Sequence, residues 1–522
     1  MNNRETDAAW VYHNGTKHSY QSVRTNHHYL DFENRPVSFK IYSELKPIAL
    51  PAQLSSSGMP SLAAISAADA LRDRQVTPTR QTLAEILFLS AGVTRRRNYP
   101  GGEILFRAAA CTGALYHIDL YLVCADLPDL PAGVYQFGPH DFALRRLRQG
   151  DFRGVLSRAS GQEPSVVDAP AVLLCASTFW RNAWKYQARA YRHCYWDNGT
   201  MLANLLAAAA ARALSAKVVV GFVDAAISAL LGLDPQREAA LSLVSLGCGA
   251  ALPVLSSTRL EPLILPTEPL SKTEIDYPAM RAMHAASSLA SEDEVVQWRA
   301  ANDFRSFTPD DRSSNGGQLF PLQALSNDDV PSDTIEDVIL RRGSTRQFAR
   351  ESITFGELST MLNRATRGIP VDFLNAGDSL NELYLIVHAV DEFAPGAYVY
   401  RRALHALELL KEGEFRREAG DLGLGQDIPA DCSVNVYFLA DLNRALDRFG
   451  NRGYRAAQLE ASIIGGKLYL AAYALGLGAS GLTFFDDDVT EFFSPDAACK
   501  SVMFLIALGK SLKRKSQLQR IV

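Results

Sequence analysis

Residues 198–224 read NGTMLANLLAAAAARALSAKVVVGFVD, a run of small and apolar residues that ends in three valines and a turn. The spacing predicts a helix over 198–214, a strand at 218–220 and a turn into a second helix. Residues 458–486 read QLEASIIGGKLYLAAYALGLGASGLTFFD and predict the same order, with glycines at 476 and 478 where the helix ends. The chain therefore repeats one plan in its two halves.

The repeat extends in both directions from these two runs. The other matched pairs are Tyr191-Arg192 with Tyr454-Arg455, the expected strands 120–123 with 383–386, and the expected strands 243–247 with 504–509. Strands that alternate with amphipathic helices indicate an α+β fold, with a central mixed or antiparallel sheet flanked by helices in each half. The alternative is a pair of unrelated α/β domains.

The length of 522 residues favours two or more domains. We expect a first domain over 1–254 and a second over 331–522. The segment 255–330 is rich in Pro, Ser and Asp and predicts a long connection, with one helix near Glu292–Asn302.

The composition is that of an ordinary globular protein, with 47% hydrophobic and 21% charged residues. The net charge of −4 gives no reason to expect nucleic acid or an anionic membrane as a partner. Seven cysteines without a C-x-x-C pair favour neither a disulfide framework nor a metal site. The first residues contain no apolar segment of the signal-peptide kind, and the longest apolar run is too short to span a bilayer, so we expect a cytoplasmic protein.

The opening of the second half carries the first chemical signal. Residues 338–348 read VILRRGSTRQF, so that Arg342 and Arg346 lie four residues apart with Ser344 between them, at the end of an apolar helix. Two guanidinium groups and a hydroxyl suit a phosphate dianion. The alternative is an arginine-rich helix end on a solvated surface.

In this region the sequence resembles the nitroreductase superfamily, whose entry motif reads R-x-S-x-R-x-F. Arg342, Ser344, Arg346 and Phe348 match that motif. The resemblance implies an FMN-binding flavoprotein in which these side chains hold the phosphate and the pyrimidine edge of the flavin.

The same resemblance implies further flavin contacts. It places Thr483 and Phe484 near the isoalloxazine ring, and basic residues on the phosphate after the last strand. Of the basic residues that follow Gly509, we assign this second role to Lys513 and Arg514.

The first half departs from the family at the corresponding positions. Its opening, Leu71-Arg72-Asp73-Arg74-Gln75, has a carboxylate and no hydroxyl, and no basic residue follows Gly247 directly. A phosphate would meet Asp73 there. We therefore expect the phosphate site of the first copy to be degenerate.

The first half instead keeps a motif that the second half lacks. Residues 110–117 read ACTGALYH and resemble the P-S-A-G-A-L-Y-P segment of SagB-type (ThcOx-like) dehydrogenases, with Cys111 and His117 as departures; the second half has NAGDSLN at 375–381. In nitroreductase dimers this loop reaches the partner's flavin. The resemblance thus implies an intramolecular pseudo-dimer with one flavin between the copies, contacted from the first copy by Cys111, Thr112, Gly113 and Ala114.

Residues 179–192 read FWRNAWKYQARAYR and resemble the F-x-R-x-x-x-K-Y-G-x-R-G-Y-R block of the same branch. The resemblance implies catalytic roles for Lys185 and Tyr186, one of which would serve as a base while the flavin takes a hydride. The second half has Arg448-Phe449 there. The alternative is a packed pair before a helix. His13 and His18 have no matching Cys or carboxylate cluster, so we expect a structural or substrate-edge role for them.

Together these features favour an FMN-dependent dehydrogenase that oxidises an azoline-type or amino-acid- or peptide-derived substrate, with O2 as one possible acceptor. Two other functions stay open: an NAD(P)H-dependent nitro or quinone reductase, and a non-catalytic peptide-binding scaffold in a biosynthetic complex. We expect a monomer or a loose homodimer, because the usual dimer interface is used within the chain.

Overall fold

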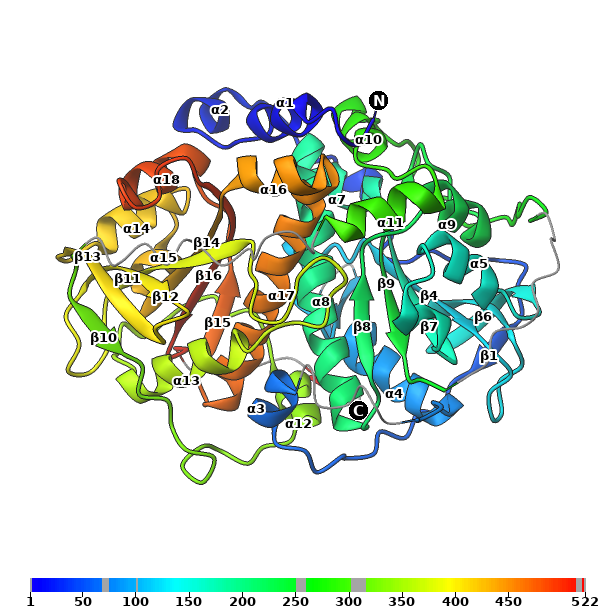
Figure 1. Cartoon of the computed structure of the whole chain (residues 1–522), viewed down its shortest axis with the longest axis horizontal. Coiled ribbons are helices and arrows are strands. Elements are labelled where there is room, and N and C mark those ends of the chain that lie inside the picture. The colour runs from blue at the N-terminus through cyan, green and yellow to red at the C-terminus, as the bar shows by residue number, and fades with distance from the viewer. Residues whose placement is uncertain are drawn as a thin grey trace.

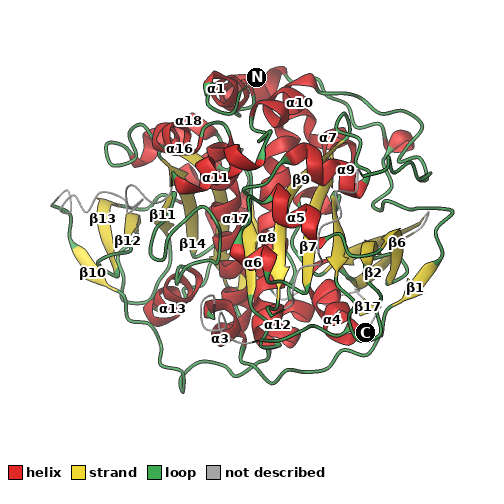
Figure 2. Ribbon diagram, turned by 45° about the vertical axis from the view of Figure 1, so that its right-hand side comes forward, coloured by secondary structure: helices red, strands yellow, loops and turns green. Residues whose placement is uncertain are grey.

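Two seven-stranded sheets, one from each half of the chain, lie on either side of a central pair of long helices (Figure 1). The computed structural model describes residues 2–67, 75–99, 102–249, 260–301 and 316–512, together with the backbone of 519–520. Both sheets are covered by helices, as Figure 2 also shows.

The first sheet has the order β1-β6-β5-β4-β7-β9-β8. Its strands are β1 (Pro47–Ala49), β4 (Ile118–Cys124), β5 (Gly133–Gly138), β6 (Ala143–Gln149), β7 (Ala171–Thr178), β8 (Ala216–Val219) and β9 (Glu238–Leu246). Every neighbouring pair is antiparallel. Strands such as β4, β7 and β9 are buried along their whole length because helices cover both faces.

The second sheet repeats this order as β10-β13-β12-β11-β14-β16-β15. Its strands are β10 (Leu319–Pro321), β11 (Asn381–Val387), β12 (Gly396–Arg401), β13 (Ala406–Glu412), β14 (Val434–Ala440), β15 (Gly478–Gly481) and β16 (Ser501–Gly509). These neighbours are also antiparallel. The predicted duplication is therefore confirmed, and of the two sheet types expected the antiparallel one is observed.

The helices follow the same correspondence between the halves. The first half has α3 (Ser61–Ser66), α4 (Arg80–Ala91), α5 (Arg153–Ala159), α6 (Pro164–Val167), α7 (Phe179–Tyr186), α8 (Ala190–Ala211) and α9 (Asp224–Leu231). The second has α12 (Ile335–Arg341), α13 (Phe355–Ala365), α14 (Arg416–Leu422), α15 (Asp427–Asp431), α16 (Leu442–Phe449), α17 (Arg452–Ala474) and α18 (Asp486–Phe493).

The long helices α8 and α17 pack against each other between the sheets (Figure 1). They are buried on nearly every side, which explains their wealth of alanine and glycine. A Cβ on Gly466 would lie 2.6 Å from the Cβ of Ala203, so glycine permits this close approach. The hydroxyl of Ser462 donates to the Tyr195 carbonyl at 2.8 Å across the same interface.

Buried ion pairs cross between the copies in both directions. Arg192 of the first copy donates to Asp486 of the second at 2.5 Å, and Arg455 of the second donates to Asp224 of the first at 2.7 Å. Although burial opposes ionisation, the arginines hold the pKa of each carboxyl below its usual range. This reciprocity is what a two-fold relation between two copies requires.

The segment between the copies contains more structure than the sequence predicts. The expected helix near 292–302 is α11 (Glu292–Ala300), and α10 (Pro278–Ala286) precedes it. Strand β10 also belongs to the segment expected as connection, and it completes the second sheet by pairing with β13.

The amino-terminal segment contacts the second copy, and the strand near the carboxyl terminus contacts the first copy. The amino-terminal helix α1 (Asp7–Gly15) and short α2 (Tyr20–Thr25) lie along the top of the molecule in Figure 1. There Asn3 donates to the Phe449 carbonyl of the second copy at 3.0 Å. Near the other end, β17 (Gln519–Arg520) pairs with β2 (Val93–Tyr99) of the first copy, which forms a hairpin with β3 (Gly102–Arg107).

The seven cysteines are all free. Among the described helices, none combines the length and the apolar character that crossing a bilayer requires.

Candidate composite site between the copies

The arginine–serine motif lies where the second copy meets the first. Arg342 follows α12 and is buried, and its guanidinium donates twice to the Ala108 carbonyl of the first copy, at 3.0 and 2.7 Å. It also lies over the ring of Tyr469, 5.7 Å from the centroid. The hydroxyl of Ser344 lies 3.3 Å from that of Tyr469. The motif is thus fixed by groups from both copies.

The first copy also supports the backbone of this motif. The guanidinium of Arg95, on β2, donates to the carbonyls of Leu340 and Arg342 at 2.8 and 2.6 Å. These are carbonyls at the end of α12, where a cation is favoured by the helix dipole.

Arg346 is exposed and lies near the predicted catalytic pair of the first copy. Partial burial of the Lys185 ammonium, with Arg346 and Arg35 nearby, lowers the pKa of Lys185. Burial of the Tyr186 phenol, with the Asp197 carboxylate nearby, raises the pKa of Tyr186. Tyr186 is therefore held as a neutral phenol, a hydrogen-bond donor.

The loop that contains Cys111 and Thr112 is fixed by one buried carboxylate. Asp197 of α8 accepts hydrogen bonds from the Cys111 thiol at 3.0 Å and from the Thr112 N–H and hydroxyl at 2.8 and 2.7 Å. Gly113 and Ala114 both adopt positive φ, 62° and 53°, a conformation that costs energy at alanine. A Cβ on Gly113 would lie 2.8 Å from the Tyr186 hydroxyl oxygen, so the loop lies directly against Tyr186.

His117 completes the same network. Its Nε2 lies 2.9 Å from Asp197 and its Nδ1 lies 2.8 Å from the Ser177 hydroxyl. Among the described residues, the side chains of Cys111, His117 and Asp197 lie close enough together to hold a metal ion. Their hydrogen bonds to one another and to Thr112 account for the cluster without one.

Thr483 and Phe484 follow β15 and approach the site from the second copy. Phe484 is buried, and its ring centroid lies 5.7 Å from that of Trp196. The Thr483 hydroxyl is buried without a hydrogen-bond partner among the described residues. A buried polar group without a partner costs about 1–3 kcal/mol, so an orphan hydroxyl here fits a ligand edge with polar atoms, as a flavin has.

Three expectations fall outside the described residues, namely those for Asp73, Lys513 and Arg514. Lys510, the first basic residue after β16, is exposed and lies 3.7 Å from Glu351. In the amino-terminal segment, His13 is buried 3.4 Å from the Tyr454 hydroxyl, and the His18 N–H donates to Asp486 at 2.8 Å. These contacts favour the structural role over a ligand role for both histidines.

Comparison with known proteins gives the family. The model of the nitroreductase family matches residues 74–248 and again residues 339–510, more than half of the chain. The chain belongs to the nitroreductase family. Its two copies are two nitroreductase domains in one polypeptide.

Individual relatives differ in how much of this nitroreductase chain they match. A solved Anabaena variabilis protein, described as a nitroreductase, matches over 97% of this chain and 99% of its own, with 26% identity and a TM-score of 0.75. A Methanocaldococcus jannaschii protein classed by name among the nitroreductases is 27% identical over 31% of this chain and 85% of its own length. The E. coli microcin synthetase McbBCD complex matches 33% of this chain and 64% of its own at 23% identity, with a TM-score of 0.29, too weak a likeness to inform function.

The position in the first copy that corresponds to the composite site, called the mate site from here on, lies around Val220 and Gly221. These residues follow β8 as Leu482 and Thr483 follow β15. Asp372 of the second copy accepts hydrogen bonds from the Val220 and Gly221 N–H groups at 2.8 and 2.9 Å. A carboxylate of the chain itself therefore occupies these backbone donors.

Trp298 of α11 fills the space beside them. A Cβ on Gly221 would lie 2.9 Å from Cζ3 of the indole. The indole N–H donates to the Phe449 carbonyl at 2.9 Å, and the two rings lie 5.3 Å apart. Phe449 ends α16 as Tyr186 ends α7. The indole of Trp298 therefore lies in the mate site at the position that corresponds to the space beside Tyr186 in the composite site.

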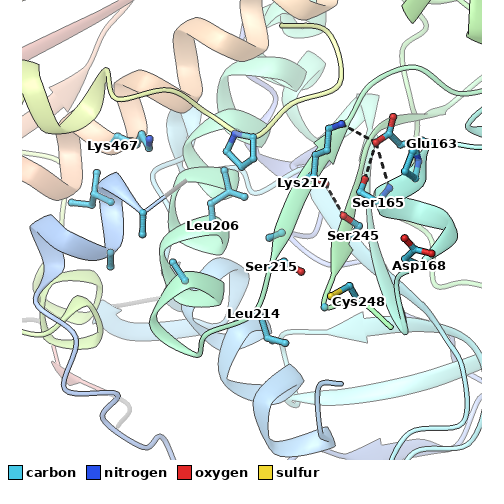
Figure 3. Close-up of a pocket in the computed structure, with 18 residues that line it drawn as sticks. Glu163, Ser165, Asp168, Leu206, Leu214, Ser215, Lys217, Ser245, Cys248 and Lys467 are labelled. Atoms are coloured by element: carbon cyan, nitrogen blue, oxygen red, sulfur yellow. Dashed lines mark hydrogen bonds and ion pairs between the residues drawn. The ribbon is translucent and has the colours of Figure 1, made fainter. Parts of the chain in front are cut away.

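A cavity of about 350 Å³ lies next to the mate site (Figure 3). Its walls come from α3, α8, β8 and the end of β9, with Lys467 from α17. The ammonium of Lys217 is 2.8 Å from the Glu163 carboxylate, which also accepts from the Ser165 hydroxyl at 3.1 Å. The described lining residues include no arginine, so the cavity differs in chemistry from the arginine–serine motif.

The sequence motifs did not indicate Asn182, His193 and Trp196, which lie beside Tyr186 on α7 and α8. The ring centroids of Tyr186 and His193 are 4.5 Å apart, and those of His193 and Trp196 are 4.8 Å apart. A comparison between the copies would have found them, because the second copy has Ala445, Ala456 and Leu459 at these positions.

Proposed function

We propose that the chain is an FMN-dependent oxidoreductase with one flavin site, the composite site between its two copies. One observation carries the proposal. Arg342 of the second copy donates to the Ala108 carbonyl of the first copy, just before the loop that Asp197 holds through Thr112. The mate site supports a stoichiometry of one flavin per chain, because Trp298 and Asp372 fill the part of it that corresponds to the ring-binding part of the composite site.

The residues for the flavin divide between the copies. Arg342, Ser344 and Arg346 would hold the phosphate, with Lys513 and Arg514 added from the carboxyl-terminal segment. Thr483 and Phe484 would line the ring, and the loop Cys111–Ala114 would close it from the first copy. When bound, FMN supplies a two-electron acceptor for a hydride.

The reaction that we favour is oxidation of an azoline-type or amino-acid- or peptide-derived substrate, followed by electron transfer to an acceptor such as O2. Tyr186 lies against the loop Cys111–Ala114, and Lys185 precedes it on α7, which supports a role for this pair on the substrate. Since the phenol of Tyr186 stays protonated, it would donate a hydrogen bond to the substrate. Lys185, whose pKa is lowered, would orient an anionic group or exchange a proton.

The first test is the flavin content of the purified protein, with the released cofactor identified by chromatography. We expect about one FMN per chain. Two per chain would show that the mate site binds flavin, and none after reconstitution would favour the scaffold function.

A double variant tests the phosphate assignment. We expect Arg342→Ala with Arg346→Ala to lose FMN retention, because each charge-assisted bond to a sheltered phosphate contributes about 1.5–3 kcal/mol. The matched control is Arg350→Ala with Arg367→Ala, two exposed arginines of the same copy. Unchanged flavin content in the first variant would refute the assignment.

The direction of electron flow needs its own experiment. Oxidation of a thiazoline-4-carboxylate ester by the FMN-loaded protein, without nicotinamide cofactor, supports the dehydrogenase. Rapid bleaching of the flavin by NADPH, with no thiazoline oxidation, supports the reductase instead.

A further inference from the structure

His193 is a buried histidine inside the composite site that no sequence motif identified. It is 2% exposed and lies between the rings of Tyr186 and Trp196, 4.5 and 4.8 Å away. Its Nδ1 lies 2.7 Å from Oδ1 of Asn182, which is fully buried on α7. The imidazole is therefore fixed in orientation by a neighbour that carries no charge.

This contact selects one tautomer. The structure turns the amide oxygen of Asn182 toward Nδ1 and leaves the amide nitrogen without a hydrogen-bond partner among the described residues. In this orientation the oxygen accepts, so Nδ1 of His193 carries the proton and Nε2 carries the lone pair. Within the described part of the chain, the hydrogen bond of this imidazole is the one between Nδ1 and Asn182. The ring thus keeps one basic nitrogen available beside the Tyr186 phenol.

The two copies differ at these positions in a way that the fold does not require. Helices α7 and α16 have equal length, and Tyr191-Arg192 corresponds to Tyr454-Arg455, so His193 corresponds to Ala456. By the same correspondence Asn182 matches Ala445. The second copy folds around two alanines, and the His–Asn pair occurs only on the side of the composite site.

The charged and titratable groups around the imidazole come from several elements. They are Arg189 directly before α8, Arg192 on α8, His117 before β4, His18 from the amino-terminal segment, and Tyr186 on α7. Burial of the ring, and then Arg189, hold the pKa of His193 well below its usual range. The ring is therefore neutral at physiological pH, whereas Tyr186 has a raised pKa and keeps its proton.

We propose that Nε2 of His193, oriented by Asn182, is the proton acceptor of the composite site. The inference rests on the proposed function and adds a residue to it. In an azoline, the C4–C5 single bond becomes a double bond when C4 loses a proton and C5 loses a hydride. Nε2 would accept that proton and form the imidazolium of His193, and a bound flavin would supply the acceptor for the hydride.

Asn182 is a positioning residue in this arrangement, because it touches His193 and sets its tautomer. Asn182→Ala keeps the imidazole but frees Nδ1, and it reproduces the alanine of the second copy. We expect it to let the ring exchange between tautomers.

Nitrogen-resolved NMR of the histidine-labelled full chain tests the state of the ring without any substrate. We expect His193, assigned by its loss in His193→Gln, to be neutral at pH 7 with its proton on Nδ1, because burial lowers its pKa. In Asn182→Ala we expect a mixture of tautomers. A proton on Nε2, or a cationic ring at pH 7, would overturn the proposal.

Activity gives the second readout. With the thiazoline-4-carboxylate ester as probe, we expect His193→Gln to keep its FMN content and lose about 10²–10⁴-fold in flavin reduction rate. The matched control is His388→Gln, since His388 is also buried, lies 3.2 Å from the amide of Asn435 and directly follows β11 of the second sheet.

Added imidazole should restore part of the rate in His193→Gly and none in Lys185→Ala. A His193→Gln rate within twofold of the unchanged protein would refute the proton-acceptor role. If the unchanged protein binds no FMN or leaves the thiazoline unoxidised, the proposed function fails, and the NMR tautomer still decides the state of His193.

Discussion

At the scale of single residues, Asp197 and Glu460 occupy corresponding positions on α8 and α17, and each holds a loop of its own copy. Asp197 holds the loop at Cys111 and Thr112, and its counterpart Glu460 accepts from the N–H groups of Leu380 and Asn381, both at 2.9 Å. Each carboxylate fixes the loop that leads into a strand, β4 in the first copy and β11 in the second. Only the loop held by Asp197 belongs to the composite site.

This pair gives a matched prediction. Asp197→Asn and Glu460→Gln should each lower the free energy of unfolding by about 1.5–3 kcal/mol, because each weakens a buried charge-assisted network. Only Asp197→Asn should also weaken FMN binding, by roughly tenfold, because it releases the loop against the flavin. Denaturant unfolding and fluorescence titration with FMN measure the two effects. Equal flavin affinity in both variants would contradict the assigned role of the loop.

Acid sensitivity is a second residue-scale prediction. Burial lowers the pKa of His388 from 6.5 to about 4. Below pH 6.5 the unfolded chain binds a proton that the folded chain does not, so this group costs stability as the pH falls from 6.5 to 4. The cost reaches about 3 kcal/mol at the lower end. His388→Gln should therefore lose less stability than the unchanged protein between pH 7 and about pH 4.5, as measured by denaturant unfolding.

The control for this measurement is His27→Gln, at an exposed position of the amino-terminal segment. It should leave the pH dependence of unfolding unchanged. A His388→Gln protein with the same acid response as the control would show that other buried groups dominate.

At the scale of elements, α11 places Trp298 in the mate site, beside Gly221. Trp298→Ala should lower the free energy of unfolding by about 3–5 kcal/mol, since it removes a fully buried indole. It should leave the flavin content at one per chain, because the mate site would still hold Asp372. Val296→Ala, half-exposed on the same helix, should change stability by less than about 0.5 kcal/mol. Calorimetry and flavin content measure both effects, and a second bound flavin would contradict the prediction.

The elements were also the part of the fold that the sequence could predict. Apolar periodicity and turn glycines indicated the long helices, the valine strand and their repetition, because these signals are local. Strand β10 could not be predicted, since three exposed and half-exposed residues form a strand only through pairing with β13. The contact between His193 and Asn182 also forms only in the folded chain, although their replacement by Ala456 and Ala445 in the second copy is visible in the sequence.

At the scale of the whole molecule, the two copies depend on each other. Buried arginines of each copy pair with a carboxylate of the other, and the composite site takes residues from both. Residues 1–301 and 316–522 expressed separately should therefore bind no FMN. Co-expressed, they should form a complex with about one FMN per pair, as shown by gel filtration and flavin content. Flavin bound by either half alone would refute a site between the copies.

The indole of Trp298 has a consequence for how such a chain changes over generations. In an assembly of two identical subunits, every mutation occurs at both active centres, so a residue that blocks one blocks the other and is removed by selection. Joining the two copies in one gene ends that coupling. In such a chain one site can hold a tryptophan and an aspartate that pack within the fold, while the other site remains subject to the demands of the proposed chemistry.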